Sequence, residues 1–560
     1  MNAKWMQWLR RIVQGAVLLL FLLLFWEAQT SLSEDPKRSL QLFFLLDPLV
    51  LIATWLAAHA VPALLLFSLI TLGATAILGR VFCGWVCPLG TVHNMASWLR
   101  RKAGRATAKL GAWSGWQRAK YYLLAGLIVM AVFGASWIGV FDPFSMLYRS
   151  MVTALYPATQ YAVEDGATAI YVGDPHVGPL HLKDATEPAY KFLRSHVFLA
   201  DRTAFLSGSV LFFIFVVAVA LNFVRPRFWC RYICPLGALL GLFARRALLR
   251  LTNEPHICTN CTRCAAVCPA AAQPQKPGEW LPTECFGCWN CVHVCEAQSV
   301  SFGFGSPFRR ASAGKLDISK RALLASMAGG IGGMLMFRLT PHAQAKTFNP
   351  ALIRPPGALK EREFLARCIQ CGLCMNVCPT NALQPTFAEA GIEGLWTPRL
   401  VPRIGYCEYE CNRCGQACPT GAIEPLSLDA KKKTVIGLAS FDTTRCLPYA
   451  YGQNCIVCEE HCPLPKKAIY TVDTEVTLRD GSTRTIRQPR VDASVCIGCG
   501  ICENVCPFED RPAIRVTSAN ETRHLDNQPI LQGLEGFDLG GPQDVYGATD
   551  PYGGAADPYK

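Results

Sequence analysis

The spacing of its cysteines constrains this chain more strongly than any other feature of the sequence. The 560 residues include 28 cysteines, an even number that says nothing by itself. Of these, 24 fall into six groups of four, and the remaining four form two Cys-x3-Cys-Pro pairs, so none is left for a structural disulfide. The groups are Cys258, Cys261, Cys264 and Cys268; Cys285, Cys288, Cys291 and Cys295; Cys368, Cys371, Cys374 and Cys378; Cys407, Cys411, Cys414 and Cys418; Cys446, Cys455, Cys458 and Cys462; and Cys496, Cys499, Cys502 and Cys506.

The first two groups predict a pair of iron–sulfur clusters. Cys258 begins a C-x2-C-x2-C-x3-C-P run, the spacing of bacterial two-cluster ferredoxins, in which the fourth cysteine ligates the other cluster. Zinc is a poor alternative because it prefers two separated C-x2-C pairs. The predicted ligands are Cys258, Cys261, Cys264 and Cys295 for cluster one, and Cys285, Cys288, Cys291 and Cys268 for cluster two.

The four later groups predict four further [4Fe-4S] clusters in two ferredoxin-like units, each expected to be a pseudo-twofold pair of βαβ elements. Two groups have the standard spacing, whereas the first gap is one residue longer after Cys407 and is eight residues long after Cys446. Their pairing is open: in sequence order, or nested, first with last and second with third. Six clusters in a row have one physical use, which is to conduct electrons. The sequence has no dinucleotide fingerprint, no C-x-x-C-H haem motif and no obvious catalytic triad.

Composition requires a membrane part. The chain is 51% hydrophobic and only 17% charged, with a mean hydropathy of +0.22, which excludes a disordered or collagen-like protein. Its net charge of +13 comes from the N-terminal part, where basic residues flank apolar runs. That pattern is typical of cytoplasmic loops beside membrane spans, and it differs from the single basic patch of a nucleic-acid-binding protein.

Five apolar runs precede the first cysteine group. They are Ile12–Trp26, Leu40–Ala60, Val61–Leu78, Tyr121–Phe141 and Ala204–Val224. If all five crossed the membrane, the basic loop at 100–120 would lie outside, against the positive-inside rule. Since Asp47 and Pro48 interrupt the second run, we expect it to be re-entrant or interfacial. Four spans then leave the N-terminus, the 79–120 loop and the chain after Arg225 in the cytoplasm, and the 142–202 loop outside.

An internal repeat runs through these spans. Each copy contains an Asp-Pro turn and ends in a Cys-x3-Cys-Pro pair, Cys83 with Cys87 and Cys230 with Cys234. Because both copies point the same way, both pairs reach the same face, where the four thiols can meet and ligate a seventh cluster or another metal. A dithiol relay and buried structural thiols are the alternatives.

Four ionisable residues lie near membrane depth, where such groups are candidates for function. Asp47, Asp142, His59 and His93 are the candidates to accept a proton from a quinol. For the two aspartates, capping of a helix end beside proline is an equally good interpretation.

A basic linker at 309–321 leads to sixteen apolar or small residues, 322–337, and an A-x-A sequence at 343–345. This is the pattern of a signal peptide inside the chain, and it resembles a twin-arginine (Tat) signal with Lys320 in place of the first arginine. A buried core helix is the alternative. We expect a fifth span, which would put 346–560 in the periplasm. The Gly-, Asp- and Tyr-rich tail at 521–560 is expected to wrap a surface or to be disordered.

These motifs together resemble a known family. The runs FCGWVCPLG and CRYICPLGAL, followed by a double ferredoxin motif, are similar to the NapH-type membrane ferredoxins. Residues 346–520, with RCIQCGLCMNVCPTNAL and GQNCIVCEEHCPLPKKAI, resemble the NapG- and MauM-type periplasmic ferredoxins. The resemblance implies a quinol dehydrogenase that feeds a periplasmic reductase, here fused into one chain, and the family also serves maturation systems.

The predicted fold is therefore a membrane α-helical bundle of four spans in a tandem repeat, with a fifth span, joined to α+β ferredoxin-like [4Fe-4S] domains. The expected domains are a membrane domain (1–244), a cytoplasmic two-cluster ferredoxin (245–308), a linker with a Tat-like anchor (309–345), a periplasmic four-cluster ferredoxin (346–520) and the tail (521–560).

The predicted function is quinol oxidation at the inner membrane, with electrons passing through the clusters to a periplasmic redox partner. The expected partners are the quinol pool, the membrane and a periplasmic reductase or multihaem cytochrome in a hetero-oligomeric complex, without nucleic acid. Two alternatives are a maturation factor that reduces a periplasmic metalloenzyme and a conduit that carries electrons from the cytoplasm to the periplasm.

Overall fold

The structure is a computed structural model, and it describes residues 3–30, 41–102, 112–177, 180–198, 202–276, 278–305, 317–338, 349–477 and 481–523. The chain forms two compact units. The first comprises 1–401 and 410–431, and the second comprises 402–409 and 432–560. The boundary falls inside the region expected to form one four-cluster ferredoxin. The predictions about the A-x-A sequence and about the tail beyond residue 523 concern residues outside the described ranges.

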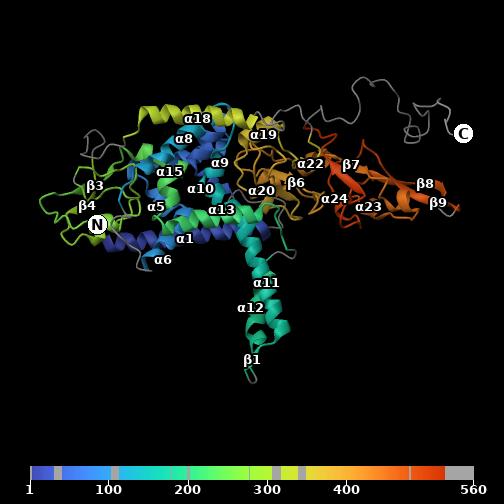
Figure 1. The fold of residues 1–560 in the computed structure, drawn as a ribbon, viewed down its shortest axis with the longest axis horizontal. Coiled ribbons are helices and arrows are strands. Elements are labelled where there is room, and N and C mark those ends of the chain that lie inside the picture. The colour runs from blue at the N-terminus through green and yellow to red at the C-terminus, as the bar shows by residue number, and fades with distance from the viewer. Residues whose placement is uncertain are drawn as a thin grey trace. The chain divides into compact units, whose positions relative to one another are not determined.

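The first repeat is built from one long helix and several short ones (Figure 1). Its elements are α1 (Ala3–Thr30), α2 (Leu42–Leu45), α3 (Pro48–Ala58), η2 (Ala63–Phe67), α4 (Ser68–Leu78), α5 (Val81–Trp85) and α6 (Pro88–Lys102). The chain breaks between α2 and α3 at Asp47-Pro48, as the sequence predicted, because proline begins a helix readily but interrupts one. Helix α3 packs against α4 and α8.

The second repeat follows the same order. Its elements are η3 (Gly115–Arg118), α8 (Ala119–Val132), α9 (Ile138–Phe141), α10 (Pro143–Ser150), η4 (Met151–Leu155), α13 (Gly208–Ala220), η5 (Leu221–Phe223), α14 (Phe228–Tyr232) and α15 (Pro235–Ala244). Asp142-Pro143 starts α10 as Asp47-Pro48 starts α3, and α14–α15 corresponds to α5–α6. The internal repeat of the sequence is thus also a repeat of the elements.

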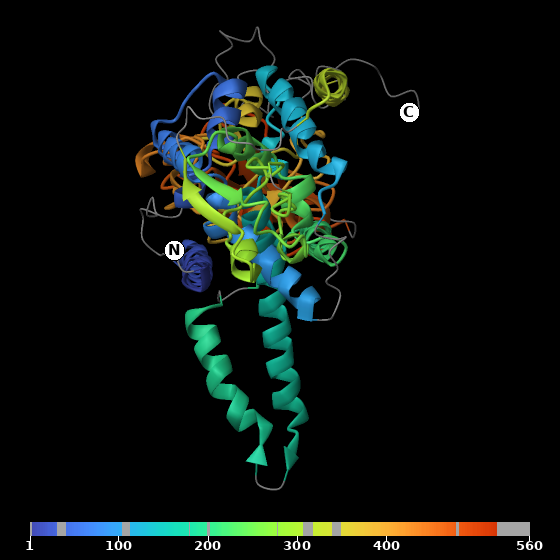
Figure 2. The same ribbon diagram turned by 90° about the vertical axis from the view of Figure 1, so that its left-hand side faces the viewer.

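The predicted outer loop at 142–202 contains a helical arm. Helices α11 (Tyr156–Gly173) and α12 (Leu182–His196) lie side by side and lead away from the other helices of the first unit (Figure 2). A short hairpin joins them, made by β1 (His176–Val177) and β2 (Leu180–His181).

Within the described ranges, one helix is long and apolar enough to cross a membrane, Ala3–Gln29 at the N-terminus. Four apolar helices are shorter: Pro48–Ala58, Ala63–Leu78, Gly208–Phe223 and Pro235–Ala244. The helix at the Tat-like segment, α18 (Lys320–Arg338), packs along α8. The two helices touch at glycines, since a Cβ on Gly330 would lie 2.6 Å from the carbonyl oxygen of Gly126.

The first ferredoxin, at 249–304, contains α16 (Arg263–Ala266) and α17 (Asn290–Val294). Its strands β3 (Leu249–Asn253) and β4 (Val300–Phe304) pair antiparallel, with Leu249 opposite Phe304. The two ends of the ferredoxin pair with each other and close the cysteine loops between them.

The C-terminal ferredoxins are also closed by short antiparallel strand pairs, so the expectation of βαβ elements, which need parallel strands, is wrong for them. The pairs are β5 (Leu383–Pro385) with β6 (Pro398–Leu400), β7 (Leu438–Phe441) with β10 (Ile514–Thr517), and β8 (Ile469–Thr477) with β9 (Thr483–Val491). The helices are α19 (Glu361–Arg367), α20 (Leu373–Asn376), α21 (Arg413–Gln416), α22 (Leu428–Lys433), η7 (Leu447–Tyr451), α23 (Val457–Glu460) and α24 (Ile501–Asn504).

Candidate electron-transfer centres

The two Cys-x3-Cys-Pro pairs occupy equivalent breaks between short helices. Cys83 lies in α5 and Cys87 just before α6, whereas Cys230 lies in α14 and Cys234 just before α15. The chain widens into a π-type turn at each break, with hydrogen bonds from Cys87 N to Phe82 O (3.0 Å) and from Cys234 N to Trp229 O (2.9 Å), each five residues back. All four side chains are buried.

The four thiols from the two repeats lie close to one another. Cys87 is within electrostatic range of Cys230 and Cys83, and Cys234 is within range of the other three. Backbone N–H groups point at the second thiol of each pair: Gly90 N lies 3.4 Å from the sulfur of Cys87, and Gly237 N lies 3.3 Å from that of Cys234. N–H donors of this kind stabilise a thiolate at the start of a helix.

Buried cations surround this four-cysteine site. Arg80, Lys120 and Arg227 are at most 1% exposed, and the carboxylate of Glu284 is also buried. Glu284 pairs with Lys120 and with Arg80, and it accepts a hydrogen bond from the hydroxyl of Tyr121 at 3.0 Å. The cations outnumber this carboxylate, and burial of an unbalanced positive charge is costly. An anionic group held by the four thiols would remove that imbalance.

The first ferredoxin is packed directly against this site. The Cβ of an alanine at position 84 would lie 2.5 Å from the carbonyl oxygen of Phe286, so the two backbones touch. Trp85 donates to the carbonyl of Gly287 at 2.9 Å, and Arg10 of α1 donates to that of Cys288 at 3.1 Å. The loop that carries Cys285 and Cys288 therefore rests on the helix that carries Cys83.

The thiols of this ferredoxin are grouped as the spacing predicted. Cys268 is within electrostatic range of Cys285, Cys288 and Cys291, the three predicted ligands of cluster two. Cys264 is within range of Cys295 and Cys261, which are predicted to hold cluster one. Each fourth cysteine thus crosses to the other group.

The C-terminal groups pair in sequence order rather than nested. In the first unit a pocket is lined by Cys368, Cys371, Cys374 and Cys418, so the fourth cysteine of the second group joins the first. Cys378 correspondingly lies near Cys411. In the second unit one pocket is lined by Cys446, Cys455, Cys458 and Cys506, and another by Cys462, Cys496, Cys499 and Cys502.

These thiol sets fit iron–sulfur cubanes better than single metal ions. A tetrahedral zinc site holds its sulfurs about 3.8 Å apart, given Zn–S bonds of about 2.3 Å. In the described parts of the chain, no three thiols lie within 4.8 Å of one another. Burial raises the pKa of Cys368 and of Cys458 to about 12, so loading of these sites with iron must displace protons.

The ferredoxin that carries Cys368 and Cys371 contacts the helical part of the first unit at a different place. Arg149 of α10 donates to the carbonyl of Gln370 at 2.8 Å, and Gln370 donates to that of Ser136 at 3.3 Å. A Cβ on Gly139 would overlap the carbonyl of Ile369. Asn376 donates to the hydroxyl of Tyr148 at 2.7 Å and to the carbonyl of Phe25 in α1 at 3.2 Å. On the helical side, this contact is formed by α9, α10 and the end of α1.

Of the four candidate quinol-site residues, the structure brings two together. Asp47 and Asp142 are fully buried and lie within electrostatic range of each other. Each also caps its helix, since Asp47 accepts from Leu49 N at 2.8 Å and Asp142 accepts from Ser145 N at 2.7 Å. Both interpretations of the aspartates, capping and a proton site, are therefore compatible with the same geometry.

The two histidines lie elsewhere. His93 of α6 is buried beside Asn222, whose amide lies 2.6 Å from its Nδ1 atom, and its Nε2 atom has no hydrogen-bond partner. His59 is exposed at the end of α3, where it adopts a left-handed conformation with φ of 51°.

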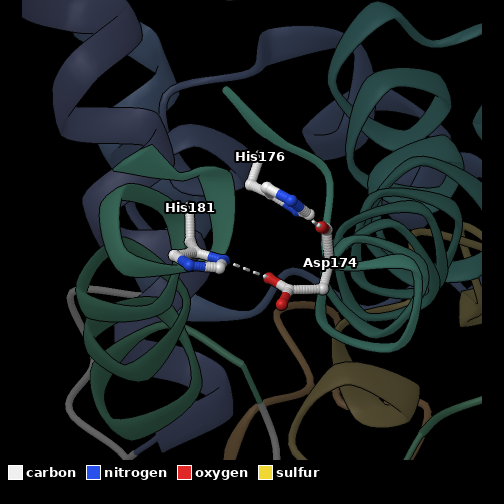
Figure 3. A group of neighbouring side chains, drawn as sticks. All are labelled: Asp174, His176 and His181. Carbon is white, nitrogen blue, oxygen red and sulfur yellow. Dashed lines mark hydrogen bonds and ion pairs between the residues drawn. The ribbon is translucent and has the colours of Figure 1, made fainter. Parts of the chain in front are cut away.

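A further group of potential metal ligands lies at the tip of the helical arm (Figure 3). Asp174, His176 and His181 have ligand atoms within 4.8 Å of one another. The Nδ1 atom of His181 lies 3.0 Å from the Asp174 carboxylate, and the ammonium of Lys183 lies 3.0 Å from its other oxygen. A cation thus already neutralises this carboxylate, and the group forms an ion-paired cap of the hairpin.

Sequence reasoning missed the buried charges. Arg80 and Arg227 stand three residues before the first cysteine of each pair, and this repeat is visible when the two copies are aligned. Glu284 precedes Cys285 and Lys120 is the second residue of α8, and neither carries a signal that distinguishes it from a surface charge.

Comparison with known proteins agrees with this arrangement. A family model described as a 4Fe-4S binding domain matches 60–106 and 207–252, the two stretches with Cys-x3-Cys-Pro pairs. Models described as 4Fe-4S dicluster domains match 250–296 and 367–422, and another 4Fe-4S binding domain matches 489–509. No solved structure is a significant match.

Several curated proteins are similar to parts of the chain. The methylamine utilization ferredoxin-type protein MauM of Paracoccus denitrificans is 37% identical over 208 residues, which are 36% of this chain and 89% of MauM. The ferredoxin-type protein NapG of Escherichia coli is 33% identical over 35% of this chain and 84% of NapG. The ferredoxin-type protein NapH of Haemophilus influenzae is 27% identical over 46% of this chain and 74% of NapH. The chain therefore contains several 4Fe-4S domains and belongs to the NapH- and NapG/MauM-type polyferredoxins, a group of iron–sulfur electron-transfer proteins.

Proposed function

We propose that this protein is a quinol dehydrogenase of the inner membrane that passes electrons through [4Fe-4S] clusters to a periplasmic reductase or cytochrome. Quinol gives up two electrons and two protons, and each cluster carries one electron at a time. In this proposal the cysteines bind the clusters, the contacts between the ferredoxins and the helices hold them against the membrane part, and a buried carboxylate accepts a proton.

The observation that carries this proposal is that two ferredoxins contact separate places on one helical unit. Helix α1 holds both, through Arg10 at the first contact and Phe25 at the second. Fifteen helical residues separate them, or about 22 Å along the helix axis. The hydrocarbon core of a bilayer is about 30 Å thick, so these contacts suit clusters near the two surfaces of a membrane.

A seventh centre at Cys83, Cys87, Cys230 and Cys234 completes the proposed route. Its four thiols lie beside cluster two, and buried cations surround them, which favours an anionic iron–sulfur group. The count is then seven clusters, six of them on the 24 cysteines of the ferredoxin groups.

An aromatic core fills the space between this site and the second ferredoxin contact. Ring contacts run from Phe82, beside Cys83, to Phe144 (5.9 Å), from Phe144 to Phe43 (5.9 Å) and from Phe43 to Phe21 (5.2 Å). Phe21 then touches Tyr148, whose hydroxyl meets the ferredoxin. A densely packed medium of this kind supports electron tunnelling, although it serves equally as a hydrophobic core.

The proposed topology has four spans within the two repeats and α18 as a fifth. Although most of these helices are shorter than α1, the glycine contact of α18 with Gly126 is the small-residue packing typical of membrane helices. The first ferredoxin then faces the cytoplasm and the residues from 346 onward face the periplasm.

The Asp47–Asp142 pair is the proposed proton acceptor for quinol. Two buried carboxylates in electrostatic range would repel each other if both were ionised, so in this proposal the pair holds one proton. Among the described residues, the oxygens Asp47 Oδ2 and Asp142 Oδ1 have no hydrogen-bond partner. Oxidation of a quinol nearby requires a group of this kind to take up its protons.

Replacement of Asp142 tests this role. Asp142→Asn keeps a hydrogen-bonding side chain at the helix cap but cannot accept a proton. We expect cluster reduction by a soluble quinol to slow by about 100-fold, while reduction by dithionite keeps its rate, in membrane vesicles followed by visible absorbance. Asp174→Asn, at the tip of the arm, is the matched control. Equal rates with quinol for Asp142→Asn and the wild type would contradict the proposal.

A second candidate function is a conduit from the cytoplasm to the periplasm. It is favoured by the direct contact of the first ferredoxin with the four-cysteine site, which offers electrons from the cytoplasm an entry to the helical unit. In that case a cytoplasmic one-electron donor, and not quinol, reduces cluster one.

A further inference from the structure

Two arginines in equivalent positions of the repeats hold one phenylalanine of the first ferredoxin between them. The guanidinium of Arg80 lies 5.1 Å from the ring centre of Phe286, and that of Arg227 lies 4.7 Å from it. All three side chains are at most 2% exposed. Phe286 follows Cys285, a predicted ligand of cluster two. The two arginines therefore contact the loop that carries this ligand.

Each arginine also reaches across to the other repeat. Arg227 donates to the carbonyls of Cys83 (2.8 Å) and Gly90 (3.0 Å), both in the first repeat. Arg80 approaches the second repeat so closely that a Cβ on Gly237 would lie 2.6 Å from its Nη2 atom. Gly90 and Gly237 stand three residues after the second cysteine of their pairs, so the contacts follow the symmetry of the repeat.

Arg80 joins the two centres most directly. Its Nη1 atom donates to the carbonyl of Thr283 at 2.8 Å, and its Nη2 atom lies 4.0 Å from the sulfur of Cys83. One planar guanidinium therefore contacts both the loop before Cys285 and a thiol of the four-cysteine site. A lysine has the charge but lacks the fork that makes both contacts and the flat face that stacks on a ring.

We propose that Arg80 and Arg227 are positioning residues that clamp Phe286 over the four-cysteine site, so that its centre and cluster two exchange electrons directly. The proposal rests on the proposed function in one respect, the seventh centre. One centre loses one electron and the other gains it, and no atom or proton moves. Because electron tunnelling weakens steeply with distance, the rate depends on how closely the loop is held.

The experiment compares Gly84→Ala with Gly73→Ala in the full, cluster-loaded protein. The added methyl at position 84 meets the carbonyl of Phe286, whereas a Cβ on Gly73, in the helix of the same repeat, has no atom within 4 Å. After partial reduction with dithionite, we measure the magnetic coupling between cluster two and the four-cysteine centre by electron paramagnetic resonance, and the electron exchange rate by rapid freeze-quench.

We expect Gly84→Ala to weaken the coupling and to slow exchange on the order of tenfold or more, with unchanged iron content, while Gly73→Ala behaves as the wild type. Arg80→Lys and Arg227→Lys should each weaken the magnetic coupling, and to the same extent. If charge alone mattered, the lysine variants would keep the wild-type coupling, and this result would overturn the clamp.

The two proposals fail differently. Both centres present with full coupling in Gly84→Ala would overturn the clamp and leave the proposed function intact. A wild-type protein with about 24 irons and no signal from the four-cysteine site would overturn the seventh centre and the clamp together.

Discussion

At the scale of single residues, Glu284 supplies the buried carboxylate that pairs with the buried cations beside the four-cysteine site. Its carboxylate pairs with Lys120 and Arg80, and Gln117 also approaches it at 3.5 Å. None of these partners has a second buried carboxylate among the contacts described. Loss of the Glu284 charge would therefore leave two buried cations without a carboxylate partner.

We expect Glu284→Gln to destabilise the first ferredoxin by about 3 kcal/mol, the usual cost of breaking a buried ion pair. The measurement is the temperature at which cluster absorbance is lost from the purified, loaded protein. Glu296→Gln is the matched control, because Glu296 pairs with Arg263 in the same ferredoxin but is 84% exposed. Exposed pairs contribute about 0–1 kcal/mol, so equal losses for the two variants would contradict this account.

The residues also show what the sequence can and cannot reveal. Cysteine spacing predicted the thiol sets of the first ferredoxin, in which the fourth cysteine of each group joins the other group. Three closely spaced cysteines wrap one cubane cluster, so the next cysteine is left for the other cluster. The same spacing left the C-terminal pairing open, since either order satisfies the local loops. The Arg80–Glu284 pair joins residues 204 positions apart, and no local pattern encodes a contact of that kind.

At the scale of elements, helix breaks were predictable and helix neighbours were not. Asp47-Pro48 and Asp142-Pro143 each start a helix, as an N-cap followed by proline should. The strands of the C-terminal ferredoxins were expected in βαβ elements and instead pair antiparallel, because the stretches between the cysteine loops are too short for a crossover helix. The packing of α18 on α8 likewise had no local signature beyond its glycines.

The glycine contact between these two helices can be tested. We expect Gly330→Ala to destabilise their packing by about 1–3 kcal/mol, because the new methyl overlaps the backbone of Gly126. A Cβ on Gly333 has no atom within 4 Å, so Gly333→Ala should be close to neutral. The measurement is the rate of amide hydrogen exchange in α18 in detergent. Equal rates for both variants would show that α18 does not depend on this contact.

At the scale of the whole molecule, the first unit gathers both electron-transfer contacts on one helical framework. The contact at Gly84 serves the first ferredoxin and that at Gly139 serves the second. Because both are tight backbone contacts, alanine at either glycine should disturb one connection and spare the other. This separation allows the competing functions to be distinguished in one protein.

We expect Gly139→Ala to abolish most quinol-driven reduction of the C-terminal clusters while cluster two is still reduced, if quinol is oxidised within the helical unit. Gly84→Ala should then show the opposite pattern, with cluster two isolated and the C-terminal clusters reduced normally.

In a conduit from the cytoplasm, either substitution stops electrons that enter at cluster one from reaching the C-terminal clusters. The measurement is stopped-flow reduction in proteoliposomes, with quinol in one series and a reduced soluble ferredoxin in the other, and the clusters distinguished by their paramagnetic signals. Gly73→Ala, which adds a methyl without a neighbour, controls for general damage to the repeat. If both variants transferred electrons from both donors at the wild-type rate, neither backbone contact would lie on the route, and the proposed path through the helical unit would be wrong.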